Sequence, residues 1–556
     1  MKKYRFDHQD NAWTTLISNG IKENTLDVVT NQFVKQLQFD QNNLNDNKSV
    51  TDCALFTPRL YNAIDKQHKI GHLIATKLFP VSEADLAKPE NINKKWNYIQ
   101  YQKCLSKLSS AFMTQIEKEQ TLNSQFREVR KTHQRKYFCE LKNKPLSDLI
   151  LNPTPMPVTV APIEELEPFY NHLALNNSVT EPMKEFIRGV QYNDGRMDLC
   201  KQVVGPPHIE KLMQSLKNNT HVEHFLLGNN IIGLNGAKAI NDFLLHEHKP
   251  NIKTWYLAGN EIDSASAQLL YEALKNDTIC EALWLKRNPI KPLGAVYIGK
   301  LLESNNHIKI LDLCNTGVLD EGVNYIFQAL YKNTTLKHLY LDANGITIDG
   351  AKNIAKYFDY LVENNKKGLT SLWIDINKLD DSGVSIIADS LKKYKYLKRF
   401  IAGSNMISDI GTKVICDTLV NSQCIVLDLG LYKSTSDLNC LPNNMGDKGA
   451  QHIAEFIKYN KSIEVLSILH NNISSEGIAI INGALQQNNT LMFVYYEQYG
   501  VEIPHSIRLS IKNKLTENIK NKYNITYDEF VSNKLRYIKG STKLKNIDSV
   551  YRNRMK

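Results

Sequence analysis

Between residues 209 and 500, hydrophobic and polar positions alternate in one recurring pattern, L-x-x-L-x-L-x-x-N-x-L. About ten segments fit it, and the ninth position recurs at residues 230, 260, 288, 316, 344, 377 and 405, mostly 28 apart. Chance does not produce such a period, so we expect a repeat architecture. The fourth positions are Phe225, Trp255, Leu283, Leu311, Leu339, Leu372, Phe400, Leu427, Leu466 and Val494.

The pattern assigns a role to each position. The apolar places fill the interior, and a buried asparagine amide at the ninth place bonds backbone groups left unpaired where a strand turns away. Thr316 interrupts this row and can do only part of that task. The predicted structural ladder is Asn230, Asn260, Asn288, Asn344, Asn377, Asn405 and Asn471.

Amphipathic segments with helical spacing lie between these strands and begin with Gly-Ala, as at residues 236, 294 and 350. Repeat length and the Gly-Ala-led helix resemble the ribonuclease-inhibitor subclass of leucine-rich repeats. The resemblance implies an α/β fold, a horseshoe solenoid of parallel inner strands and outer helices that holds partners on its concave face. It covers about half of the chain and implies no chemistry.

The flanking segments predict further parts. Residues 1–150 read as a mainly helical domain of unknown role, with apolar residues three or four apart between 96 and 135. Residues 151–168 hold five prolines and predict an extended connector. Residues 169–208 predict a helical N-terminal cap, residues 209–500 the repeats, and residues 501–556 a basic helical C-terminal cap and tail, with an amphipathic helix over 505–523.

The residue between positions 4 and 6 points out of the concave face, because side chains alternate along a strand. Five of the ten residues there are Trp or Tyr, types that dominate binding hot spots. The alternative is that these large side chains merely cover neighbouring strands. The predicted partner-binding residues are the aromatics with a charged surround: Tyr256, Trp284, Lys286, Arg287, Asp312, Tyr340, Asp342, Trp373, Asp375 and Tyr495.

One repeat is interrupted after Leu429 by about ten extra residues before the helix that starts near Gly446. Long insertions of this kind often contact ligands. A tolerated, solvated loop explains the insertion equally well, because lengthening a surface loop costs little entropy.

The net charge of +10 is concentrated at the end of the chain. Residues 506–556 carry 13 Lys and Arg against 4 Asp and Glu, while the repeats form no basic stripe. We therefore expect no nucleic-acid partner. For the tail alone, contact with an anionic membrane or nucleic acid and an export signal are alternatives, and a solvated end is the favoured interpretation.

Candidate chemistry is sparse. The nine cysteines include no Cys-x-x-Cys pair, and His68 and His72 lack the glutamate of a zinc protease, so we expect neither metal nor cofactor. Cys139 with His133 or His172 would need a geometry that sequence does not give. The turn from Gly233 to Lys238 lacks phosphate-loop spacing and belongs to the repeat.

These patterns predict a non-enzymatic protein that binds another protein on the concave face; a small-molecule substrate is not expected. The alternatives are an enzyme and a ubiquitin-ligase adaptor whose unrecognised functional domain lies in residues 1–150. With no apolar stretch after the initial charges, we expect a cytoplasmic protein. The Asn-, Lys- and Ile-rich style is also similar to leucine-rich repeat effectors of intracellular bacterial pathogens, which implies delivery into a host cell.

Overall fold

A computed structural model describes residues 146–155, 158–245, 251–432, 434–534 and 547–553. The chain divides into two compact units, Met1–Cys139 and Glu140–Lys556, and all of the described residues belong to the second. The predicted helical domain over residues 1–150 therefore lies almost wholly outside the described residues.

One sheet of thirteen strands runs through the second unit, and its strands follow each other in chain order. β1 and β2 pair antiparallel, as do β2 and β3, whereas every pairing from β3 to β13 is parallel. The strands are β1 (Met183–Glu185), β2 (Val190–Tyr192), β3 (Arg196–Asp198), β4 (His224–Leu226), β5 (Thr254–Tyr256), β6 (Ala282–Trp284), β7 (Ile310–Asp312), β8 (His338–Tyr340), β9 (Ser371–Trp373), β10 (Arg399–Ile401), β11 (Val426–Asp428), β12 (Val465–Ser467) and β13 (Phe493–Tyr495).

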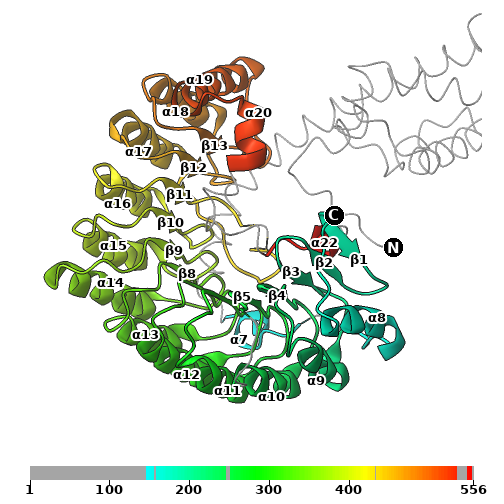
Figure 1. The fold of residues 1–556 in the computed structure, drawn as a ribbon. Helices are drawn as coiled ribbons and strands as arrows, with labels where there is room; N and C mark the ends of the chain where they lie inside the picture. The colour runs from blue at the N-terminus through cyan, green and yellow to red at the C-terminus, as the bar shows by residue number, and fades with distance from the viewer. Residues whose placement is uncertain (1–145, 156–157, 246–250, 433, 535–546, 554–556) are drawn as a thin grey trace, which may run out of the picture. The chain divides into compact units, whose positions relative to one another are not determined.

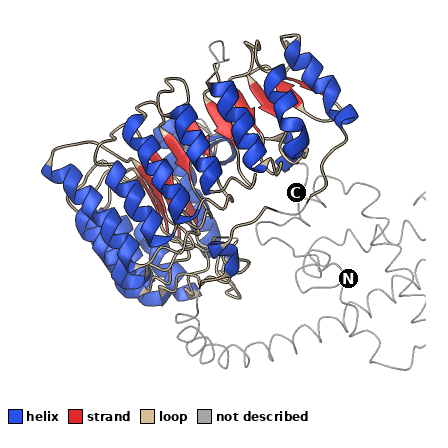
Figure 2. Cartoon of the chain, turned by 90° about the horizontal axis from the view of Figure 1, so that it is seen from below, coloured by secondary structure: helices blue, strands red, loops and turns tan. Residues whose placement is uncertain are grey.

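Helices form an outer layer, and the strands line the inner side of the arc (Figures 1 and 2). The horseshoe of parallel strands and outer helices is as predicted. The helices of the array are α9 (Gly205–Ser215), α10 (Gly233–Leu244), α11 (Ser264–Leu274), α12 (Lys291–Ser304), α13 (Leu319–Ala329), α14 (Ile348–Glu363), α15 (Asp380–Leu391), α16 (Asp409–Leu419), α17 (Gly446–Tyr459) and α18 (Ser475–Leu485).

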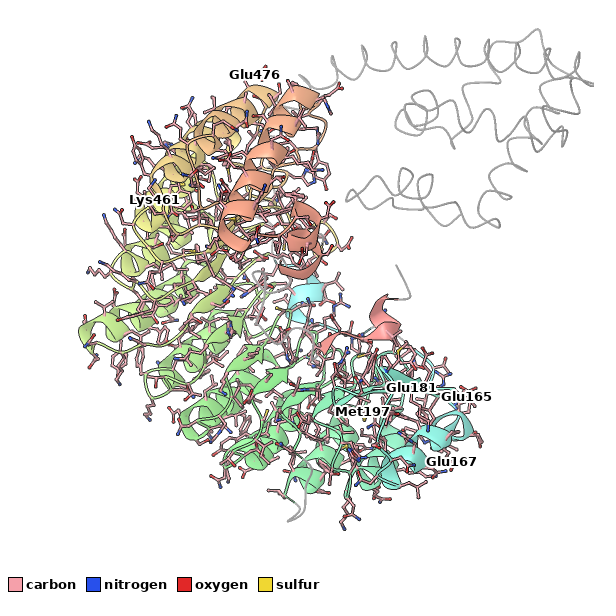
Figure 3. The ribbon with its side chains drawn as sticks, turned by 45° about the horizontal axis from the view of Figure 1, so that its top comes forward. Glu165, Glu167, Glu181, Met197, Lys461 and Glu476 are labelled. Carbon is pink, nitrogen blue, oxygen red and sulfur yellow. The ribbon has the colours of Figure 1, made fainter. Side chains whose placement is uncertain are left out.

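The core lies between these two layers. The middle residue of each strand from β4 to β13 points into it, as the repeat pattern requires, and each of these ten side chains is at most 5% exposed. Figure 3 shows the side chains along the arc, with Met197 near the cap residues Glu165 and Glu167 and with Lys461 and Glu476 at the other end. One continuous apolar core therefore stabilises the whole array.

The prediction of a helical cap over residues 169–208 is wrong for its central part, which forms strands. Helix α8 (Ile163–Ala174) begins inside the predicted connector, and β1, β2 and β3 follow it. The apolar spacing at residues 183–190 imitates a helix, but Gly189 and Gly195 adopt φ of +99° and +84° and form the turns of an antiparallel meander. A Cβ on Gly189 would come within 2.2 Å of the Phe169 ring, so this turn needs glycine.

The parallel array starts one strand earlier than the pattern search indicated, because β3 pairs in register with β4. The sequence did hold a signal: Met197-Asp-Leu-Cys200 repeats Leu311-Asp-Leu-Cys314. A glutamine at residue 202, in the ladder position, hid the match.

The asparagine ladder joins each repeat to the one before it. Asn288 Oδ1 accepts from the backbone N–H groups of Asn260 (2.8 Å) and Ile262 (3.1 Å), and its Nδ2 donates to the carbonyls of Leu257 and Leu285. Thr316 Oγ1 instead donates to the carbonyl of Leu313 in its own repeat (2.7 Å). The ladder is therefore weakest at this point.

Aspartates at the start of alternate helices add a second set of links. Asp320 Oδ1 accepts from the backbone N–H groups of Thr347 (2.8 Å) and Gly350 (2.9 Å), which open the next helix, α14. Asp381 binds the start of α16 in the same way. Each such carboxylate satisfies amides that a helix N-terminus leaves unpaired.

The chain's own flanking segments pack against the array at its C-terminal end and at its middle. Helix α19 (His505–Tyr523) buries Ile511 and Leu515 in the main core and Ile519 in a second apolar cluster with Met492, where the sequence predicted a closing helix. The short helix α7 (Asp148–Leu151) lies against the turns that follow β7, where Asn315 Nδ2 donates to the carbonyl of Leu149 (2.9 Å). Asn152, near the start of the predicted connector, accepts from Lys291 Nζ (2.7 Å), so the connector begins bound to the repeats.

Candidate functional site: the concave face

A row of aromatic rings follows the inner side of the sheet from β5 to β9. The ring centroids of Tyr256 and Trp284 are 6.3 Å apart, those of Trp284 and Tyr340 5.4 Å, and those of Tyr340 and Trp373 4.9 Å. All four residues stand at the last position of their strands, opposite one another in the sheet register. The repeat pattern thus brings together rings that are far apart in sequence.

These rings form a small apolar cluster separate from the main core. We call it the concave cluster; Tyr256, Trp284 and Tyr340 in it are 8%, 5% and 6% exposed, while Trp373 is half-buried. Tyr495 stands at the same strand position on β13, beyond the row, and is half-buried beside Phe493. The cluster consists of Cys200, Leu226, Tyr256, Ala258, Ala282, Trp284, Ile310, Cys314, Tyr340 and Ile547, with Trp373 and Tyr551 packed against it.

Two polar atoms of this cluster lack hydrogen bonds. Within the described part of the chain, Trp284 Nε1 and the Tyr340 hydroxyl are buried and have no hydrogen-bond partner. Trp373 differs, because its Nε1 donates to Ser371 Oγ at 2.9 Å. A buried donor without a hydrogen bond costs free energy. The indole N–H of Trp284 and the hydroxyl of Tyr340 would therefore be stabilised by a hydrogen-bond acceptor on a bound molecule.

The aspartates predicted as a charged surround are buried and have structural roles instead. Asp312, Asp342 and Asp375 are at most 6% exposed. Asp342 Oδ1 accepts from the Asp375 backbone N–H (2.9 Å), and Asp375 Oδ1 accepts from that of Gly403 (2.6 Å). A chain leaving a strand exposes unpaired amides, and these carboxylates bind them.

The basic pair of the prediction behaves differently. Lys286 is half-buried, and its Nζ lies 6.0 Å from the ring centroid of Tyr432, whereas Arg287 is exposed. Tyr432 belongs to the insertion after β11, which reaches across the inside of the arc to the turn after β6. In Figure 1 the yellow insertion crosses the inner side accordingly. The insertion therefore covers part of the concave face.

Burial controls the ionisation of these groups. Desolvation raises the pKa of Asp312, an effect that the nearby Lys286 ammonium opposes, and it raises the pKa of Asp342 to about 6. Burial also holds the pKa of the Cys314 thiol well above its usual range, and this thiol donates to Asp342 (3.2 Å). A protonated, buried thiol is a poor nucleophile, so this arrangement suits contact better than covalent chemistry.

The other residues that the sequence offered for metal binding, nucleophilic catalysis or phosphate binding do not form a site among the described residues. His172 is buried and pairs with Gln191 Oε1 (2.9 Å), and Gly233 simply opens helix α10. His68, His72, His133 and Cys139 lie outside the described residues. Within the described ranges, no group of three or more His, Cys, Asp or Glu side chains could hold a metal ion, and no helix is long and apolar enough to cross a membrane.

Sequence reasoning missed several residues of the inner face. Asn443 takes the ladder place of the interrupted repeat, where its Oδ1 accepts from the Asn405 backbone N–H (2.7 Å), and Gln498 does the same for Asn471 (2.7 Å). The template missed Asn443 because the insertion shifts its position, and it missed Gln498 because the pattern requires asparagine there. Ile547, in the expected solvated end, is only 8% exposed.

This fold defines a leucine-rich repeat solenoid, and the chain is similar to proteins of the ribonuclease-inhibitor type. A family profile described as "Leucine Rich repeat" matches residues 332–355. The chain is similar to the ribonuclease inhibitor of Sus scrofa, with 22% identity over 284 residues that cover 51% of this chain and 59% of that protein.

Larger relatives are matched over a smaller share of their own length. NACHT, LRR and PYD domains-containing protein 14 of Mus musculus is 24% identical over 49% of this chain and 26% of its own length, and protein 9C is 26% identical over 64% and 34%. The chain thus spans about a quarter to a third of these relatives. A solved internalin from Listeria monocytogenes covers 66% of the chain at 16% identity and a TM-score of 0.31. Leucine-rich repeats of this kind are protein-interaction scaffolds.

Proposed function

We propose that the protein is a non-enzymatic scaffold that binds a protein partner on the concave face of its repeats. The observation that carries the proposal is the aromatic row from β5 to β9, in which Trp284 Nε1 and the Tyr340 hydroxyl have no hydrogen-bond partner in the described part of the chain. Aromatic groups with one polar edge dominate protein-binding hot spots.

The half-buried Trp373 is the best probe of this proposal, because its replacement disturbs the array less than replacement of the buried Trp284. A photo-crosslinking amino acid at residue 373 should capture a discrete partner in cell lysate. The same probe at residue 297 is the control, since Tyr297 is half-buried on the outer helix α12. Equal capture from both positions would contradict concave binding.

The captured partner then permits a quantitative test with purified proteins. Trp373→Ala should weaken binding by about 10-fold or more, which corresponds to a hot-spot loss of about 1.4 kcal/mol. Tyr297→Ala should change the affinity by less than about twofold. Unchanged affinity in Trp373→Ala would refute the model.

We also propose that the protein acts in a reducing compartment such as a cytosol. The six cysteines of the described residues are free thiols, and five of them are buried, a pattern that supports reduced conditions. From the similarity in composition to bacterial leucine-rich repeat effectors, we further propose that the protein is delivered into a host cell. A translocation reporter fused to the chain tests this while the producing bacteria infect cultured cells. Signal confined to the producing cell would overturn it.

A further inference from the structure

The C-terminal tail returns to the inner side of the array at two separate places. After α19, α20 (Tyr527–Glu529) and a π turn (Phe530–Lys534) bring Phe530, 0% exposed, into an apolar cluster with Ile401, Val426 and Val465. Residues 547–551 lie instead at the opposite end, against β3. Figure 1 shows α22 (Val550–Asn553) beside β2 and β3. The tail is thus fixed at both ends of the concave face.

Residues 547–551, which we call the latch, make specific polar contacts. Ser549 Oγ donates to Asp198 Oδ1 (2.9 Å), and the Val550 backbone N–H donates to Asp198 Oδ2 (3.0 Å). The Tyr551 hydroxyl accepts from the Gly189 backbone N–H (2.9 Å). On the other side, Arg196 Nη1 donates to the backbone carbonyl of Asp548 (2.5 Å).

The latch also has one apolar anchor. Ile547 belongs to the concave cluster together with Trp284 and Tyr340, and Tyr551 packs against the same cluster. The chain's own tail therefore packs in the same apolar cluster as Trp284 and Tyr340, the residues that we propose contact a protein partner.

Comparison with equivalent aspartates shows what is special about Asp198. Asp198, Asp312 and Asp428 stand at one register position, and each accepts from the backbone N–H two residues further on. In the described part of the chain, Asp198 is the only one of the three that also accepts hydrogen bonds from outside the repeats, and the donors are Ser549 and Val550. The repeat structure thus explains the hydrogen bond from Cys200 to Asp198. Recognition of the latch explains the two bonds from Ser549 and Val550.

We propose that the latch is a displaceable, intramolecular occupant of the concave face, and that a protein partner reaches the concave cluster only when the latch leaves. The requirement for release rests on the proposed function; the docking of the latch does not. A tethered segment acts at an effective concentration on the order of millimolar, so even a weak latch stays closed until a stronger ligand competes.

A labelled peptide tests the docking directly in the full chain. Fluorescein-labelled peptide 541–556 should bind the Ile547→Asp variant about 10-fold or more tightly than wild type, in which the tethered tail competes. The milder Tyr551→Phe, which removes the acceptor for Gly189, should give a smaller gain in the same direction. No peptide binding to either folded variant would overturn the proposal, as would equal binding to all three proteins.

A matched pair of aspartate variants tests the recognition of the latch. The substitution Asp198→Asn would place an N–H donor against the N–H of Val550, while its side-chain oxygen could still accept from the N–H of Cys200. Adding Asp198→Asn to Ile547→Asp should therefore abolish peptide binding, whereas adding Asp428→Asn should leave it unchanged. Loss of binding in both would mean that the array, and not the latch site, was damaged, and would count against the proposal.

Hydrogen exchange of the full chain decides whether the tail docks in its own molecule. Peptides covering residues 547–553 should be protected in wild type and should exchange about 10-fold faster in Asp198→Asn, at a rate independent of protein concentration. Protection that grows with concentration, together with dimers in sedimentation, would replace the proposal by exchange of tails between two copies. If the latch fails these tests while Trp373 still captures a partner, concave binding stands without the latch.

Discussion

Trp284 on β6 and Tyr340 on β8 hold their ring centroids 5.4 Å apart although β7 lies between their strands. The residue between them in the register is Asp312, whose shorter side chain accepts from the backbone N–H of Cys314 at 2.8 Å. The two rings thus meet across an aspartate. This contact makes the aromatic row continuous, so the row contributes to stability as well as to the proposed binding.

Trp284→Ala should lower the free energy of unfolding by about 3 kcal/mol, because it removes a buried ring that packs on both Tyr256 and Tyr340. Urea denaturation followed by circular dichroism measures this change. Tyr297→Ala, at a half-buried outer position, should cost about 1 kcal/mol. Equal losses would show that the row adds no packing energy.

Thr316→Asn should raise the stability by about 1 kcal/mol, since an asparagine there can accept from the Asn288 backbone N–H as its neighbours do in the other repeats. No such bond to Thr316 is found in the described residues. The midpoint of urea denaturation reports the gain. A lower midpoint would mean that the local bond from Thr316 to Leu313 is worth more than the missing ladder link.

Asp381→Ala should cost about 1–3 kcal/mol, because it removes one of the two acceptors at the N-terminus of helix α16, where only the Ser408 cap would remain. The backbone N–H of Ser408 (2.8 Å) and that of Gly411 (3.0 Å) both lose their bond. Asp389→Ala, on the exposed side of the preceding helix α15, is the control and should stay within about 0.5 kcal/mol. Urea denaturation of both variants measures the two losses of stability. If the two losses are equal, the hydrogen bonds that Asp381 accepts from the next repeat do not stabilise the array.

His338, on the concave side of β8, should make the array less stable as the pH falls from 6.5 to about 4. Burial, with the charges of Arg399 and Lys337, lowers its pKa to about 4. Between these values the unfolded chain binds a proton that the folded chain does not, so acidification favours unfolding by up to about 3 kcal/mol.

His338→Gln should flatten this part of the stability profile, measured as denaturation midpoints at a series of pH values. His307→Gln replaces an exposed histidine of the preceding repeat and serves as the control. The assignment fails if the two variants give the same profile as the wild type.

The sequence predicted the repeats well because each repeat is a local pattern. The ten strands from β4 to β13 lie where the template placed them, since hydrophobic spacing sets which side chains face the core. The same logic failed at residues 183–198, where glycine turns override a helical spacing. It also failed at Asn443 and Gln498, where equivalent bonds come from displaced or different residues.

The sequence by itself therefore determined the solenoid, its inner and outer faces and the aromatic row, because these depend on the spacing of neighbouring residues. Only the tertiary structure decided what covers the row. The bonds of Asp198 to Ser549 and Val550 join residues about 350 apart. No local pattern records such a contact, because the two segments meet only in the folded chain.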